Sequence, residues 1–229
     1  MRGPILALLS GSDMITVVLS FFSVFVIIFL VFPFREFARA WVAKQLGDNT
    51  AEESGMLTMN PLAHIDPMGA LCMCLCCIGW SRPTPININR CRKVSQNAAV
   101  VLVSLTGPLS LFLLGFLLMI IAKVLLVTIL TQTTLYISVA LGYAAQICSY
   151  LAVLNLLPVP PFDGYYIIAG ILPRKAAIWM ETNARIINFV VLILLISGAL
   201  SGPLSFLSGK MLDLMDLLTI WICPFPFFL

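Results

Sequence analysis

Long runs without a charged residue constrain this chain more than any other feature. They extend over residues 14–34, 94–122, 124–162 and 186–209. A helix needs ~20 apolar residues to cross a bilayer. With 61% hydrophobic and only 10% charged residues, the chain is not a soluble enzyme, a disordered protein or a nucleic-acid-binding protein. The pattern predicts an all-α polytopic membrane protein whose single transmembrane domain covers residues 1–229.

The third run is too long for one span, and its polar stretch 131–134 predicts a break. We therefore expect about four spanning helices, at roughly 14–34, 98–122, 135–157 and 186–209. A fifth apolar run, 67–81, is short for a helix across the bilayer. It is predicted to be a re-entrant hairpin buried in protein.

The basic residues indicate the orientation of the chain. Most of them follow the first span, follow the hairpin or precede the last span, whereas Arg2, Lys123 and Lys210 lie on the other side. Short cytoplasmic loops carry an excess of Lys and Arg. The distribution predicts that loops 35–66, 80–93 and 163–185 are cytoplasmic and that both termini lie outside.

Four motifs combine polar and charged residues near the predicted cytoplasmic side, and a fifth, LTGPLS, lies inside the predicted span 98–122. They are FREFARAW at 34–41, LTMNPLAHIDP at 57–67, GWSRPTPIN at 79–87, LTGPLS at 105–110 and NLLPVPPFDG at 155–164. In order and spacing they resemble the site-2 protease family of intramembrane zinc metalloproteases, in particular its compact bacterial members. The resemblance implies a site-2 protease core in the fold and a bacterial plasma membrane as the location.

Members of that family carry H-E-x-x-H in the first motif. Two His residues at positions i and i+4 lie on one helix face and can bind one zinc ion, while the Glu between them acts as general base. The resemblance implies that Asp163 occupies the position of the third zinc ligand. It also implies that Asn155 occupies the position that hydrogen-bonds the substrate backbone.

This chain departs from the family pattern at both His positions, which are Arg35 and Arg39, while Glu36 is retained. A guanidinium group has no lone pair to donate to a metal. His64, the only His, lies in a different motif. We therefore expect no metal or other cofactor, and we expect Glu36 to be a vestigial general-base position.

A charge count gives the substitution a physical meaning. The formal charges of a zinc ion, one Glu and one Asp sum to zero. The formal charges of Arg35, Arg39, Glu36 and Asp163 also sum to zero. Buried charges in a membrane persist when they are paired. We predict an ion network of these four side chains in place of the metal. The simpler interpretations are that both Arg residues set topology and that Asp163 is a turn residue.

Two further features have open interpretations. Cys72, Cys74, Cys76 and Cys77 could bind a soft metal through thiolates if the hairpin is extended, or they could serve as small apolar residues. His64 is expected to form a hydrogen bond within its own loop, with Asp66 as a candidate partner.

These observations predict a catalytically impaired pseudoprotease that binds a transmembrane segment of a client protein in the bilayer. Edge strands of the hairpin are candidates for pairing with the client backbone. The alternative is an active intramembrane zinc metalloprotease with an atypical metal site, in which case zinc is the cofactor. A third interpretation is a small transporter with Lys123 and the Arg, Glu and Asp group on its pathway. The sequence does not identify the client or the oligomeric state.

Overall fold

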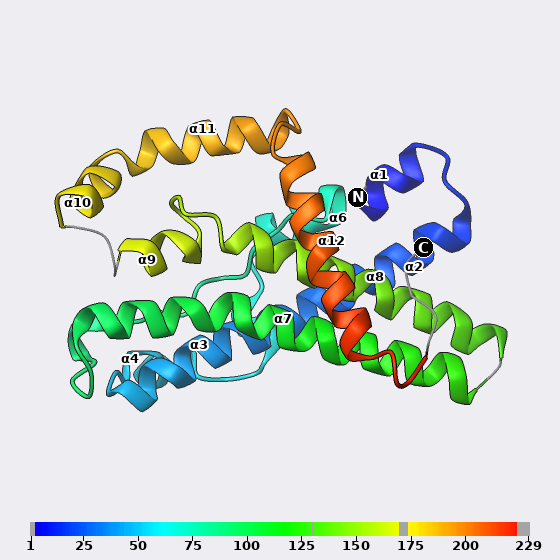
Figure 1. The fold of residues 1–229 in the computed structure, drawn as a ribbon, viewed down its shortest axis with the longest axis horizontal. Coiled ribbons are helices and arrows are strands. Elements are labelled where there is room, and N and C mark those ends of the chain that lie inside the picture. The colour runs from blue at the N-terminus through cyan, green and yellow to red at the C-terminus, as the bar shows by residue number, and fades with distance from the viewer. Residues whose placement is uncertain (1–2, 130, 170–173, 224–229) are drawn as a thin grey trace.

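The computed structural model describes residues 3–129, 131–169 and 174–223, and their regular secondary structure is entirely helical (Figure 1). The N-terminal half contains α1 (Pro4–Leu9), α2 (Met14–Val26), the π-helix η1 (Ile27–Val31), α3 (Phe32–Leu46), α4 (Thr50–Glu53), α5 (Pro61–His64), α6 (Pro67–Cys76) and the 3-10 helix η2 (Ile88–Arg90). The C-terminal half contains α7 (Gln96–Thr128), α8 (Gln132–Asn155), α9 (Asp163–Ala169), α10 (Arg174–Thr182), α11 (Ala184–Ile196) and α12 (Ser201–Leu218).

The first long helix runs without interruption through α2, η1 and α3. Its π-helical segment, η1, ends directly before α3, in which Pro33 is the second residue. Proline lacks an N–H group and its ring collides with the carbonyl four residues earlier, so a widened turn lets the helix continue. The helix ends at Leu46, followed by Gly47 with a φ of 112°. The predicted first span therefore continues well past residue 34 and carries the first motif on the same helix.

The polar stretch 131–134 separates α7 from α8, as the sequence predicts. The Thr131 side chain accepts a hydrogen bond from the Thr134 backbone N–H, and Thr134 Oγ1 accepts one from the Thr131 N–H. This reciprocal cap begins α8. The break turns one long apolar run into two antiparallel neighbours.

Three of the described helices are long and apolar enough to cross a membrane, namely Met14–Leu46, Gln96–Thr128 and Gln132–Asn155. They lie along the long axis of the molecule, and α12 crosses α7 and α8 (Figure 1). The protein is thus an all-α polytopic membrane protein. These three helices correspond to the first three predicted spans.

The fourth predicted span, 186–209, is divided in the structure. α11 ends at Ile196, and the chain turns at Gly198, which has a φ of 76°, before α12 begins at Ser201. Glycine adopts this left-handed conformation without the steric cost that a side chain imposes. The segment therefore forms two helices with different directions instead of one continuous span.

The predicted re-entrant element, 67–81, contains the short helix α6 followed by an irregular segment. Cys77 ends the helix in a left-handed conformation with a φ of 56°. The part of the chain that the structure describes contains no strand, so the expected edge strands are not formed there. The irregular segment instead runs past the first motif.

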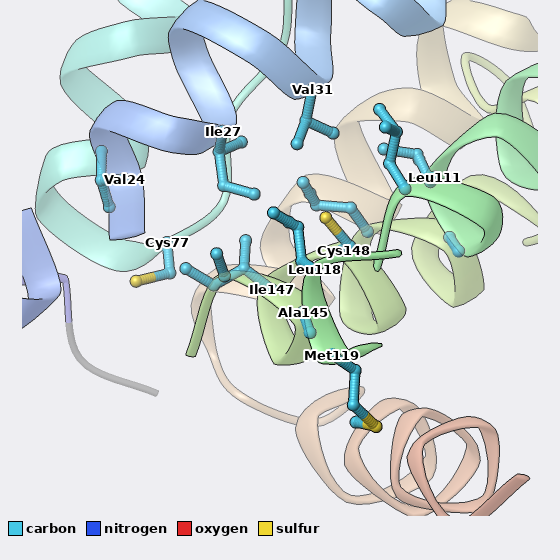
Figure 2. Packing of buried hydrophobic residues seen from close by; sticks show 14 of the residues in the cluster. Val24, Ile27, Val31, Cys77, Leu111, Leu118, Met119, Ala145, Ile147 and Cys148 are labelled. Carbon is cyan, nitrogen blue, oxygen red and sulfur yellow. The ribbon is translucent and has the colours of Figure 1, made fainter. Parts of the chain in front are cut away.

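The core lies where α2, η1, α7, α8 and α12 meet. Val24, Ile27 and Val31 pack toward Leu118 of α7 and Ile147 of α8 (Figure 2). Gly115 of α7 lets α7 and α8 pack closely, since a methyl group added there would lie 2.9 Å from Cβ of Cys148 on α8. Small residues at such contacts let the backbones of membrane helices approach. This packing fixes the relative positions of α3, α7 and the C-terminal end of α8.

Candidate functional site

Three elements bring the predicted site residues together. Arg35 and Arg39 lie one turn apart on one face of α3, with Glu36 between them. Asn155 is the last residue of α8, and Asp163 is the first residue of α9, after a proline-rich turn. The structure therefore gathers all five positions that the resemblance identifies.

Gly107 of α7 makes room for this convergence. A methyl group at this position would collide with Oδ2 of Asp163 and would lie 3.3 Å from Nη2 of Arg35. Only a residue without a side chain lets the Asp163 carboxylate sit against the α7 backbone. The LTGPLS motif thus has a direct steric role in the site.

Arg35 links both carboxylates. Its Nη1 lies 2.6 Å from Oε1 of Glu36, and its Nη2 lies 2.6 Å from Oδ2 of Asp163. Nη2 also donates to Oδ1 of Asn155 at 3.2 Å. The two ion pairs have the short lengths of charge-assisted hydrogen bonds. Arg35 is thus the centre of the cluster.

Arg39 is held more loosely. Its Nη2 lies 3.4 Å from Oδ1 of Asp163, and its Nη1 lies 3.8 Å from Oε2 of Glu36. Its side chain is 17% exposed, against 1% for Glu36 and 5% for Asp163. The two guanidinium groups lie 2.6 to 3.8 Å from the two carboxylates, so the ion network that the charge count predicts is present in the structure.

Glu36 is fully buried and is held by more than the two Arg residues. Its Oε1 accepts a hydrogen bond from Ser81 Oγ at 2.9 Å, and its Oε2 accepts one from the Thr84 backbone N–H at 3.1 Å. Both donors come from the irregular segment after α6. This segment belongs to the motifs that carry the resemblance, but the role of Ser81 and Thr84 is not predictable from the sequence, because short polar residues next to prolines give no signal of a distant partner.

Asn155 is already engaged. Its side-chain N–H donates to the Leu151 carbonyl at 2.7 Å, and its Oδ1 accepts from Arg35. One amide N–H is left over for another acceptor. Its use as a substrate-binding residue remains a prediction.

A cavity of about 620 Å³ opens over the cluster. Its polar lining includes Arg35, Glu36, Arg39, Asn155 and Asp163. Its apolar lining comes from the irregular segment after α6, from the end of α8, from the proline-rich turn and from α11, and comprises Ile78, Trp80, Leu154, Phe162, Val191, Leu192 and Leu195. The combination suits an apolar chain with a polar group at one end.

Comparison with known proteins identifies the family. The chain is 35% identical over 167 residues to the "Putative zinc metalloprotease YwhC" of Bacillus subtilis (strain 168), and the match covers 72% of this chain and 75% of that protein. The chain belongs to the same protein family. This agrees with the resemblance to site-2 proteases and makes the chain a protease-like membrane protein. No family model and no solved structure matches it.

The name of this relative implies zinc, and the residues of the cluster do not fit that ion. The resemblance assigns two ligand positions to Arg35 and Arg39, whose guanidinium groups have no lone pair to donate. The Asp163 carboxylate, to which the resemblance assigns the third position, is paired with Arg35 at 2.6 Å. Within the described residues, no three His, Cys, Asp or Glu side chains are grouped so that they could hold a metal ion.

The other predicted features lie outside the cluster. His64 is buried and its Nε2 lies 2.8 Å from the Thr58 carbonyl oxygen, so its partner is in its own loop but is not Asp66. Asp66 instead accepts from the Gly69 N–H at 2.7 Å and caps α6. The extended register that would align Cys72, Cys74 and Cys76 on one face is not formed, because these residues lie in a helix.

Lys123, which the charge distribution places on the outer side of the membrane, is buried in the structure. Its side chain is 1% exposed, and Nζ lies 2.8 Å from Oδ1 of Asp216 on α12. This pair is not predictable from a local pattern, because the two residues are far apart in the sequence and lie on helices whose crossing is set by packing. The pair does not line the cavity above the cluster.

Proposed function

We propose that this protein is a membrane-embedded pseudoprotease that binds an unwound transmembrane segment of a client protein without cutting it. The observation that carries the proposal is the position of Arg35, whose guanidinium bridges Glu36 and Asp163 at 2.6 Å each. In the family pattern a zinc ion would join these same positions. Here an ion network joins them, and its guanidinium groups have no lone pair with which to bind a metal ion that would activate a water.

The cavity supports the binding part of the proposal. It borders α11, whose Val191 is buried while Phe189 and Ile193 are exposed. We place the protein in a bacterial plasma membrane, in keeping with the source of its relative. In that setting α11 lies between the lipid and the cavity. A client segment that leaves its helical form in the cavity exposes backbone groups, and the polar cluster offers them partners.

The decisive experiment measures zinc and cleavage in the detergent-purified full chain. We expect the native chain to hold no stoichiometric zinc and to leave a transmembrane model substrate intact. The variant Arg35→His/Arg39→His restores two imidazoles on one helix face and should take up close to one equivalent of zinc. Stoichiometric zinc in the native chain, with cleavage lost in Glu36→Gln, would contradict the proposal and support an active metalloprotease with an atypical site.

Binding needs its own measurement. A photo-crosslinking residue at Leu192, which lines the cavity, should capture a synthetic transmembrane peptide that carries a helix-breaking Asn-Pro pair. The matched control is the same residue at Leu113 on α7, which is exposed to a similar degree but does not line the cavity. Equal capture at both positions would indicate contact through the lipid phase only, and it would count against a client site.

A further inference from the structure

Arg39 has more hydrogen-bond capacity than the protein uses. Arg35 donates to Glu36, Asp163 and Asn155, whereas Arg39 donates no hydrogen bond to any residue that the structure describes. Its two ion pairs, at 3.4 and 3.8 Å, are longer than the 2.7–2.9 Å of a charge-assisted hydrogen bond. A guanidinium carries five N–H donors. The two Arg residues therefore differ in role, and Arg39 is the one with donors to spare.

The surroundings of Arg39 determine which acceptor group its N–H donors can bind. Arg39 lines the 620 Å³ cavity, whose other walls are largely apolar. Arg35 and Arg39 are the only basic residues among its described lining residues. A planar fork of N–H groups can donate to both oxygens of a carboxylate at once, whereas a backbone carbonyl offers a single oxygen. In an apolar cavity an acidic group needs such a cation in direct contact.

We propose that the cavity selects client segments in which an Asp or Glu side chain is flanked by apolar residues, and that Arg39 binds this carboxylate. The inference rests on the proposed function and names the substrate class of the same site. Arg35 makes it electrostatically feasible, because its 2.6 Å contacts keep Glu36 and Asp163 paired when Arg39 turns to the client.

The cavity has a continuation that accommodates the rest of such a segment. Pro161, Tyr166 and Asn188 line both this cavity and a second one of about 350 Å³ between α7, α9, α10 and α11. The second cavity also contacts Asn97 and Glu181, which are exposed polar residues on the predicted cytoplasmic side. A client whose acidic residue reaches Arg39 can therefore extend its polar flank toward the cytoplasm.

The test compares two synthetic peptides that differ only by Asp against Asn within an otherwise apolar sequence, binding to the full chain in lipid nanodiscs. The two side chains have the same shape and differ in charge. We expect the native chain to bind the Asp peptide roughly tenfold more tightly. Arg39→Gln should abolish the preference, so that the Asp and Asn peptides bind with equal affinity. Arg39→Lys, which keeps the charge but loses the fork, should retain a reduced preference.

Arg92→Gln is the matched control, because Arg92 is an exposed basic residue that lines a separate cavity. It should preserve the full preference for the Asp peptide. Equal binding of both peptides to the native chain would overturn the carboxylate proposal while leaving the proposed function in place. A preference that survives Arg39→Gln would overturn the assignment to Arg39. Absence of binding by either peptide would contradict the proposed function itself. Displacement of both peptides by a fatty acid, with no Asp preference, would indicate a lipid ligand and overturn the inference.

Discussion

Nη2 of Arg35 lies 2.6 Å from Oδ2 of Asp163, although 128 positions of sequence separate the two residues. This single contact joins α3 to the start of α9. The proline-rich turn between Asn155 and Asp163 and the irregular segment at Ser81 and Thr84 meet at the same place. Four segments remote in sequence thus converge on one ion pair.

Arg35→Ala should destabilise the protein more than Arg39→Ala. The first change removes the short contacts of two buried carboxylates and should cost about 3–5 kcal/mol, whereas the second removes only long contacts and should cost roughly 1 kcal/mol. Thermal unfolding in one detergent, followed for both variants, measures the difference. A greater loss in Arg39→Ala would show that the ranking by distance is wrong.

The Arg35–Asp163 pair should behave as one coupled unit. We expect Arg35→Ala/Asp163→Ala to lose less stability than the sum of the two single variants, by about 1–3 kcal/mol, since each single change strands the other charge. A double-mutant cycle on unfolding midpoints gives the coupling. Strict additivity would mean that the two side chains do not stabilise each other.

Gly107→Ala should damage the cluster although it adds only a methyl group to α7. The new Cβ would lie 3.1 Å from Cγ of Asp163 and closer still to Oδ2, so the carboxylate has to move away from Arg35. We expect a loss of roughly 2 kcal/mol or more, in the range of overpacked sites. The readout is unfolding temperature.

Gly209→Ala is the control for that experiment. Gly209 lies inside α12, and a methyl group there meets nothing within 4 Å. Replacing a glycine in a helix interior by alanine stabilises by roughly 0.5–1 kcal/mol. Equal losses at Gly107 and Gly209 would point to a general effect of the substitution and not to the cluster.

Lys123→Met should loosen the attachment of α12. The change removes the buried partner of Asp216, whose Oδ1 lies 2.8 Å from Lys123 Nζ, and should cost about 3–5 kcal/mol. Hydrogen exchange at α12 should increase more than at α3. Lys210→Ala, which breaks an exposed pair with Asp213 at 2.9 Å, should change stability by less than about 1 kcal/mol. Similar effects of both variants would show that the buried pair of Lys123 stabilises the protein no more than the exposed pair of Lys210.

The sequence was most informative where a local rule decides the outcome. Apolar runs predict long helices, and the polar residues around Thr131 end one and begin the next. Spacing of Arg35 and Arg39 predicts a shared face. Local rules did not predict the turn at Gly198, after which α12 packs against α7 and α8.

The residues alone predict the class of protein, give the order of the motifs and show guanidinium groups where the resemblance expects two metal-binding side chains. These conclusions follow from hydrophobicity and from the lone pairs that each side chain has. The tertiary structure decided which Arg is the centre of the cluster, which donors hold Glu36 and why position 107 has no side chain. Those properties depend on distances between residues remote in sequence. Such distances are set by helix packing, which no local sequence pattern specifies.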